Sequence, residues 1–139
     1  MATIIDGKAL AARMRERAAA DVASLAERGI SCGLAVVLVG DDQASATYVR
    51  SKLRDCEQCG IRSFDCKLPA DTPQDDLMAL IAELNADPEV TGILVQMPLP
   101  SHLDTEAVVL AVDPEKDVDG FHPLNMGRLV RDLPGLRPC

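Results

Sequence analysis

The order of apolar and polar positions along the chain predicts helices that alternate with strands. Residues 6–28 are rich in helix formers, and Gly29 follows as a helix stop. Five apolar residues in this segment recur at helical spacing: Leu10, Met14, Ala18, Val22 and Leu25. Residues 33–40, "GLAVVLVG", form a short apolar run, which indicates a strand buried on both faces. A second helix is expected over residues 44–59, ended by Gly60.

The second half of the chain continues this alternation. The expected elements are a strand over 61–68, a helix over 72–87, a strand over 90–97, a short helix over 102–112 and a helical piece over 125–130. Thr72 is predicted as the N-cap of the helix over 72–87, with Pro73 at its first position and acidic residues in its first turn. Pro98 and Pro100 end the third strand, and one of these X-Pro bonds is a candidate for the cis form.

Strands alternating with helices of this length predict an α/β fold. We expect one three-layer αβα domain over residues 1–139, with a mostly parallel sheet and helices on both faces. Polar residues cluster just after the strands, at residues 40–52, 95–100 and 113–123. Because open parallel sheets bind ligands at the carboxyl ends of their strands, these clusters are expected to meet in one cleft.

Composition narrows the classes of partner. Aromatic residues make up only 2% of the chain, so Leu, Val, Ile and Ala must fill the core. The net charge of −8 argues against a nucleic-acid partner, since phosphate binding needs clustered Lys and Arg. No apolar run approaches the roughly 18 residues needed to cross a bilayer, and no signal peptide is evident. We therefore expect a cytoplasmic protein with no membrane partner.

The five cysteines favour free thiols in a reducing compartment. "CEQC", residues 56–59, has the spacing of a redox or zinc motif, but it lies inside a predicted helix and no second CxxC accompanies it. Small apolar filling is the favoured interpretation, and no metal site is expected. The other cysteines (Cys32, Cys66, Cys139) and the two histidines (His102, His122) stand alone. There is no GxGxxG or P-loop motif, so the motifs indicate no nucleotide site.

Tyr48, the only tyrosine, precedes Lys52 by four residues, which puts both side chains on one face of a helix. One interpretation is a lysine that transfers protons beside a phenol, a role that suits a partly buried amine. The other is a solvated lysine next to a half-buried tyrosine. The same spacing occurs in short-chain dehydrogenases, so the pair alone does not decide between them.

Two more polar features stand out. Gln96 is the only amide at the end of an apolar strand; it either bonds to backbone or points into the cleft, where it would hold a ligand or orient Lys52. Asp117 and Asp119 precede Gly120. An Asp-Gly turn is one interpretation of this stretch, and a carboxylate that accepts two parallel N–H bonds from a planar heterocycle is another. A metal site is disfavoured, because a hard cation needs more oxygen ligands.

Three stretches taken together, "VGDDQASATYVRSK", "GILVQMPLP" and "PEKDVDGFHPLNMGRL", are far more specific than any of them alone. With them the chain resembles the N-terminal half of the bifunctional methylenetetrahydrofolate dehydrogenase/methenyltetrahydrofolate cyclohydrolase family. The resemblance implies a one-carbon metabolism enzyme that serves purine biosynthesis. It would oxidise 5,10-methylenetetrahydrofolate with NADP and hydrolyse the methenyl product to 10-formyltetrahydrofolate.

Carried over residue by residue, the resemblance implies catalytic roles for Lys52, Tyr48 and Gln96. The implied substrate-binding residues are Ser45, Tyr48, Gln96, Pro98, Leu99, Pro100 and Asp119, with Asp119 anchoring the pterin. Members of the family run about twice this length and continue into an NADP-binding Rossmann domain that is absent from this chain. No cofactor-binding residue is therefore expected here, and a homodimer is expected at full length. Two alternatives remain open: a folate-binding module without turnover, and a generic α/β domain with Tyr48 and Lys52 on its surface.

Overall fold

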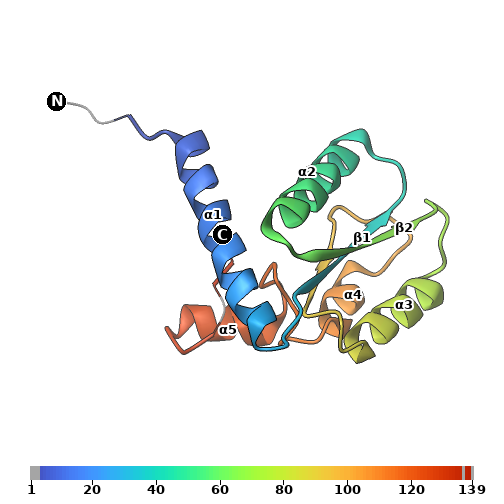
Figure 1. The fold of residues 1–139 in the computed structure, drawn as a ribbon. Helices are drawn as coiled ribbons and strands as arrows, with labels where there is room; N and C mark the ends of the chain where they lie inside the picture. Colours follow the sequence, from blue (N-terminus) through green and yellow to red (C-terminus); the bar gives the residue numbers. More distant parts are fainter. Residues whose placement is uncertain (1–3, 136, 139) are drawn as a thin grey trace.

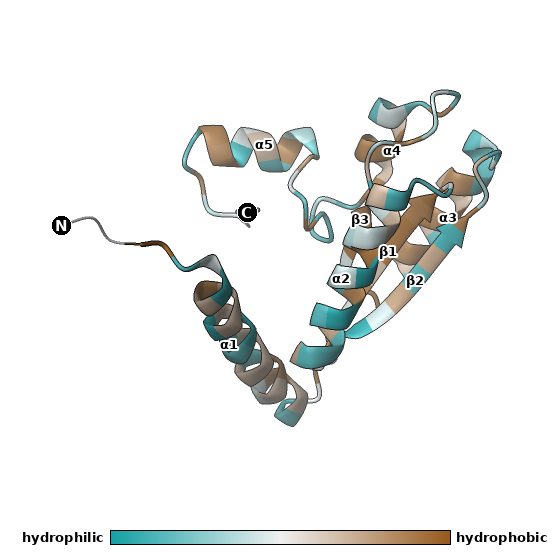
Figure 2. Ribbon diagram, turned by 90° about the horizontal axis from the view of Figure 1, so that it is seen from above, coloured by the Kyte–Doolittle hydropathy of each residue, from teal (hydrophilic) through white to brown (hydrophobic). Residues whose placement is uncertain are grey.

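Three parallel strands form a single sheet (Figures 1 and 2). The computed structural model describes residues 4–135 and 137–138. Strands β1 (Gly33–Val39), β2 (Arg62–Leu68) and β3 (Gly92–Val95) lie in the order β2-β1-β3. Val37 of the central strand pairs with Cys66 on one side and with Val95 on the other. All three predicted strands are confirmed, and β3 is shorter than the expected 90–97 because the chain leaves the sheet at Gln96.

Helices cover both faces of this sheet, which confirms the predicted α/β architecture (Figure 2). Helix α2 (Gln43–Cys59) covers one face, where Val49 packs on a small cluster of strand residues: Val36, Leu38 and Leu94. Helices α3 (Gln74–Ala86) and α4 (Thr105–Ala111) cover the other face with a larger core that includes Val37, Leu77, Ile81, Ile93, Val95 and Val108. Alternate residues of β1 thus enter two different cores, as a strand buried on both faces requires.

Helix α1 (Gly7–Glu27) lies apart from the sheet and contacts α2 (Figures 1 and 2). Asp6 caps its first turn, and the Cys59 Sγ lies 3.6 Å from the Arg15 carbonyl where the two helices meet. The helix is confirmed, but its apolar stripe is only partly covered: 46% of Leu10 and 63% of Met14 are exposed.

The predicted cap of α3 is wrong. Thr72 is buried, and its hydroxyl donates to the Pro69 carbonyl at 2.7 Å, which closes a turn before the helix. Pro73 has extended backbone and occupies the N-cap position, so the helix begins at Gln74. The acidic first turn is confirmed. The two later helices shift slightly: α4 is shorter than expected, and α5 (Pro123–Val130) starts earlier, where His122 Nδ1 accepts the Leu124 N–H.

Gly33 starts β1 where the segment 89–91 passes very close, and its replacement by alanine is expected to destabilise the fold. An added Cβ would lie 2.0 Å from the Glu89 carbonyl oxygen and 2.9 Å from the Phe64 ring. Such overpacking costs about 1–3 kcal/mol. Urea unfolding measures this loss. The control is Gly7→Ala, where nothing lies within 4 Å of the new Cβ, and an equal loss in both variants would refute the steric explanation.

Candidate active site

The strand order creates a crevice between the carboxyl ends of β1 and β3. The chain leaves the central strand into α2 on one face and leaves β3 toward α4 on the opposite face. The connections therefore diverge at this point, and open α/β sheets bind ligands at such a topological switch point. The segments that flank the crevice are Gly40–Asp42 after β1 and Gln96–Pro100 after β3, as the sequence predicts.

Lys52 of α2 and Gln96 at the end of β3 come together next to this edge of the sheet. The Lys52 ammonium donates to Gln96 Oε1 at 3.1 Å, and both side chains are partly buried. Gln96 Nε2 donates in turn to the Met97 carbonyl at 2.8 Å, which holds the amide oxygen toward the amine. Gln96 therefore bonds both to backbone and to Lys52, and its role toward a ligand stays a prediction. The amine is held by a partner rather than extended into bulk solvent.

Tyr48 and Ser45 lie earlier on α2 and differ in exposure. Tyr48 is 65% exposed, one helical turn before Lys52, so its ring is free to contact a ligand. Ser45 is buried, and its N–H donates to Asp42 Oδ1 at 2.8 Å. This bond and a hydrogen bond from the Ser45 side chain lower the pKa of the Asp42 carboxyl. Ser45 therefore helps to begin α2, and its hydroxyl faces its own cap.

The third segment is the loop 117–122, which contains both aspartates of "DVDG". Asp117 is buried, and its carboxylate accepts the N–H groups of Gly120, Phe121 and His122. The turn interpretation is thus confirmed for Asp117. Asp119 is only partly buried. Burial raises the pKa of Asp119, the attraction of Lys52 lowers it, and the repulsion of Asp117 adds to the rise. Asp119 therefore lies within the electrostatic reach of the site lysine.

Two recesses border the segment after β3. Asp117, Asp119 and Phe121 line an apolar recess together with Met97 and residues of β3 and α4. Pro98, Leu99 and Pro100 line a second recess, opposite Gly40 and Asp42. The Met97–Pro98 peptide bond is cis. Met97 lines the first recess and Pro98 lines the second. The segment that begins at Gln96 therefore separates the recess that contains the two aspartates from the open recess beside Gly40.

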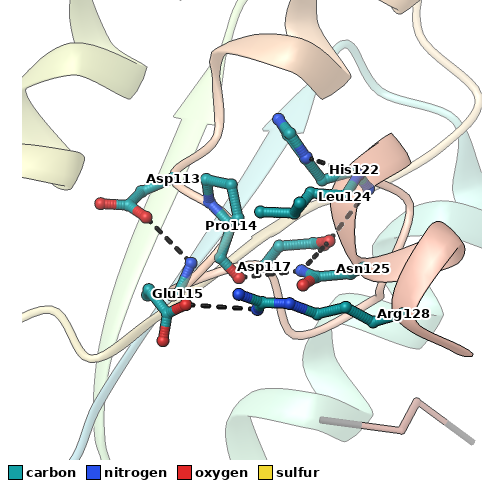
Figure 3. Close-up of polar contacts among 8 residues, drawn as sticks. All are labelled: Asp113, Pro114, Glu115, Asp117, His122, Leu124, Asn125 and Arg128. Carbon is teal, nitrogen blue, oxygen red and sulfur yellow. Dashed lines mark hydrogen bonds and ion pairs between the residues drawn. The ribbon is translucent and has the colours of Figure 1, made fainter. Parts of the chain in front are cut away.

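Sequence reasoning missed the residues that hold the 117–122 loop. Asn125 of α5 is buried, and its Nδ2 donates to Asp117 Oδ2 at 3.0 Å and to the Pro114 carbonyl at 2.8 Å (Figure 3). Lys116 donates to three carbonyls at the end of α3, those of Leu84, Asn85 and Asp87. For Asn125, the only sequence signal was a polar residue in an apolar segment. For Lys116, it was a lysine just before "DVDG". Neither signal predicts burial.

The raised pKa of Asp119 predicts that Asp119→Asn stabilises the domain at neutral pH. When a carboxyl has a higher pKa in the folded chain than in the unfolded chain, the folded state loses stability as the pH rises from the ordinary pKa of about 3.9 through the raised pKa. The amide carries no charge and avoids this loss. The variant is expected to melt at a higher temperature at pH 7, and the gain disappears below about pH 3.9. Thermal melts across pH check this, with exposed Asp71→Asn as control; a gain independent of pH would contradict it.

The remaining sequence features take no part in this site. Within residues 4–135, Cys32, Cys56, Cys59 and Cys66 are free, and burial raises the pKa of the Cys56 and Cys66 thiols. Cys139 lies outside the described residues. No group of three potential metal-binding side chains occurs in the part of the chain that the structure describes. The same part contains no helix long and apolar enough to cross a membrane.

A parallel α/β domain with an amine and an amide bonded at its switch point, and a carboxylate that senses the charge of that amine, has the arrangement typical of domains that bind small polar ligands. Comparison with known proteins gives the particular family. Residues 5–119 match the family described as "Tetrahydrofolate dehydrogenase/cyclohydrolase, catalytic domain", and the chain belongs to that family.

Curated relatives and solved structures agree with this assignment. The chain is 55% identical over 139 residues to the bifunctional protein FolD of Geotalea uraniireducens and 58% identical to that of Nitrobacter hamburgensis. It covers 50% and 47% of those two proteins, while 100% and 99% of this chain is aligned. The chain thus spans about half the length of the curated relatives it matches.

Two solved structures superpose closely. The bifunctional FolD enzyme from Campylobacter jejuni has a TM-score of 0.95 at 47% identity, over 99% of this chain and 49% of the other. The methylenetetrahydrofolate dehydrogenase-cyclohydrolase from Trypanosoma brucei, complexed with NADP cofactor and inhibitor, has a TM-score of 0.94 at 37% identity. That match covers 99% of this chain and 48% of the other.

Proposed function

We propose that residues 1–139 form the folate-binding catalytic domain of a bifunctional methylenetetrahydrofolate dehydrogenase/methenyltetrahydrofolate cyclohydrolase. The observation that carries the proposal is the 3.1 Å bond between Lys52 and Gln96 at the switch point, with Asp119 within reach of the same amine. These groups come from three separate segments of the chain, after β1, after β3 and before α5.

In the hydrolysis, Lys52 moves the protons. Water adds to the cationic carbon that joins N5 and N10 of the folate, which forms a C–O bond and releases a proton. The carbon–N5 bond then breaks: N5 takes up a proton while the hydroxyl on the carbon loses its own, so the carbon remains on N10 as a formyl group and one proton is released overall. The Lys52 amine, placed beside the reacting carbon, accepts the proton of the attacking water and returns one to N5. Gln96 holds that amine in place.

The same segments supply the substrate contacts. Asp119, in its apolar recess, accepts two N–H bonds from the amino-pyrimidinone edge of the pterin. The exposed Tyr48 ring stacks on the substrate or orients it. Pro98, Leu99 and Pro100 form the wall of the adjoining recess. Ser45 contributes by fixing the start of the helix that carries Tyr48 and Lys52.

NADP is proposed for the whole protein, bound outside these 139 residues. The described residues do not fit a dinucleotide: the turn after β1 is Gly40-Asp41-Asp42, and the Asp42 carboxylate occupies the start of α2, where a phosphate would bind. No step of the oxidation is therefore derived from this chain. The whole protein is further proposed to be a cytoplasmic homodimer whose 10-formyl product serves purine biosynthesis.

Hydrolysis of 5,10-methenyltetrahydrofolate by this chain, followed by absorbance without NADP, tests the proposal. The expected result is hydrolysis above the buffer rate, with saturation in substrate. Saturable binding of a folate analogue without hydrolysis would leave only the folate-binding module. Absence of both would refute the proposal and favour a generic α/β domain with Tyr48 and Lys52 on its surface.

A further inference from the structure

The Asp117 carboxylate is buried without a cation within ion-pair distance among the described residues. It instead accepts three successive backbone N–H groups, at 2.9 Å from Gly120, 3.3 Å from Phe121 and 2.9 Å from His122. Successive N–H groups that point at one place form a concave anion site. Here the protein's own carboxylate fills that site, so the turn 117–122 closes around Asp117.

Asp119 lies inside this closed turn. On its N-terminal side, the backbone at residues 116–118 pairs with Ile93 next to the sheet, since Ile93 N–H donates to the Lys116 carbonyl at 2.7 Å. On its C-terminal side, residues 120–122 are bonded to the Asp117 carboxylate. The backbone of Asp119 is therefore held from both directions, and the attachment on the C-terminal side includes the three bonds to the Asp117 carboxylate.

Asn125 is the side chain that fixes Asp117 (Figure 3). One hydrogen of its Nδ2 goes to Asp117 Oδ2 and the other to the Pro114 carbonyl, so this amide joins α5 to both ends of the segment 114–117. An ion pair between Arg128 and Glu115, at 3.3 Å, links the same helix to the same segment. Asn125 is buried, so its removal leaves a carbonyl and one carboxylate oxygen without that donor.

We propose that Asn125 is a positioning residue for the substrate: through the Asp117 carboxylate it sets the place of Asp119, which anchors the pterin. The inference rests on the proposed function for the role of Asp119, but the geometric link from Asn125 to Asp119 is independent of it. The substrate contact thus depends on a helix residue that never touches the substrate.

A double-mutant cycle tests this link by the dissociation constant of a folate analogue. Asn125→Ala is expected to raise that constant roughly tenfold, a coupling typical of residues in one hydrogen-bond network. In the Asp119→Asn background the same change is expected to have no further effect, because the group it positions no longer binds. An equal factor in both backgrounds would overturn the inference, since a residue that acts only on general stability affects binding independently of Asp119.

Asn85→Ala is the matched control. Asn85 is a partly buried amide that joins α3 to the end of α4 and the residues after it through the Ala111 carbonyl and the Asp113 N–H. It has no bond to Asp117 among the described residues. Its removal is expected to lower the melting temperature without a change in analogue affinity. A tenfold loss of affinity in this control as well would overturn the specific role of Asn125.

A second measurement separates this inference from the proposed function. The ¹³C signal of the Asp119 carboxyl, followed against pH in aspartate-labelled protein, reports its surroundings without any ligand. Asn125→Ala is expected to shift the Asp119 midpoint toward the ordinary aspartate value, because the loosened turn exposes that carboxyl; Asn85→Ala is expected to leave it in place. If the unsubstituted chain fails to bind folate, the proposed function fails, and this titration still decides the inference. An unchanged midpoint in Asn125→Ala would overturn it.

Discussion

Replacing Lys52 with methionine is expected to abolish hydrolysis of 5,10-methenyltetrahydrofolate while a folate analogue still binds. Methionine keeps the length and apolar character of the lysine stem but has no proton to accept or donate. Loss of a positioned acid–base group lowers turnover by about 10²- to 10⁴-fold. Binding is expected to survive because the proposed pterin contact at Asp119 and the proposed Pro98–Pro100 wall come from other segments. Absorbance assays of turnover and calorimetric titration with the analogue measure the two effects separately.

The control for this prediction is Lys8→Met. Lys8 is exposed in the first turn of α1, far along the chain from the crevice, and its replacement removes one positive charge in the same way. Its turnover is expected to equal that of the unsubstituted chain. Hydrolysis that continues at an undiminished rate in Lys52→Met would mean that water attacks without help from this amine, and the catalytic assignment would then be wrong.

The meeting of Lys52 and Gln96 could be predicted because the strands that place them are continuous apolar runs. Burial is expected for the apolar runs 33–39 and 92–95 because they contain no polar side chain. Gly40 and Gln96 mark where each run ends. The first polar residues beyond two neighbouring parallel strands must lie at the same edge of the sheet. The strand pattern thus predicted that these residues lie close together, and the family resemblance added the role of each.

The roles of Asp117 and Asn125 could not be predicted in the same way. "DVDG" offers two carboxylates, and which one is buried depends on the pairing of residues 116–118 with Ile93, a contact made over twenty residues away. Asn125 lies on an exposed helix, so its local sequence gives no sign that it is buried. Its hydrogen-bond partner, the Pro114 carbonyl, comes from a segment eleven residues earlier. Thr72 failed for a related reason, since its hydroxyl donates to the Pro69 carbonyl, and no side-chain hydrogen bond caps the helix that follows.

Asp119→Ala is expected to weaken binding of a folate analogue by roughly 10- to 100-fold or more. The carboxylate is proposed to accept two N–H bonds from the pterin, and a hydrogen bond to a charged group contributes about 1.5–3 kcal/mol. The apolar walls of the recess offer no acceptor, and Asp117, the other carboxylate that lines it, already accepts bonds from backbone N–H groups and Asn125. Calorimetric titration gives the dissociation constant, and exposed Asp21→Ala, which removes the same charge from α1, serves as control.

Comparison with an analogue that lacks the exocyclic amino group decides whether this loss comes from the proposed contact. If Asp119 accepts a hydrogen bond from that amino group, the unsubstituted chain binds the truncated analogue weakly. In Asp119→Ala, the dissociation constants of the two analogues then differ far less. If the alanine variant instead weakens both analogues by the same factor, Asp119 acts through the general field of the crevice beside Lys52. Other groups must then anchor the pterin. If Asp119 accepted the bond from the exocyclic amino group, its removal would abolish the preference for the analogue that carries that group.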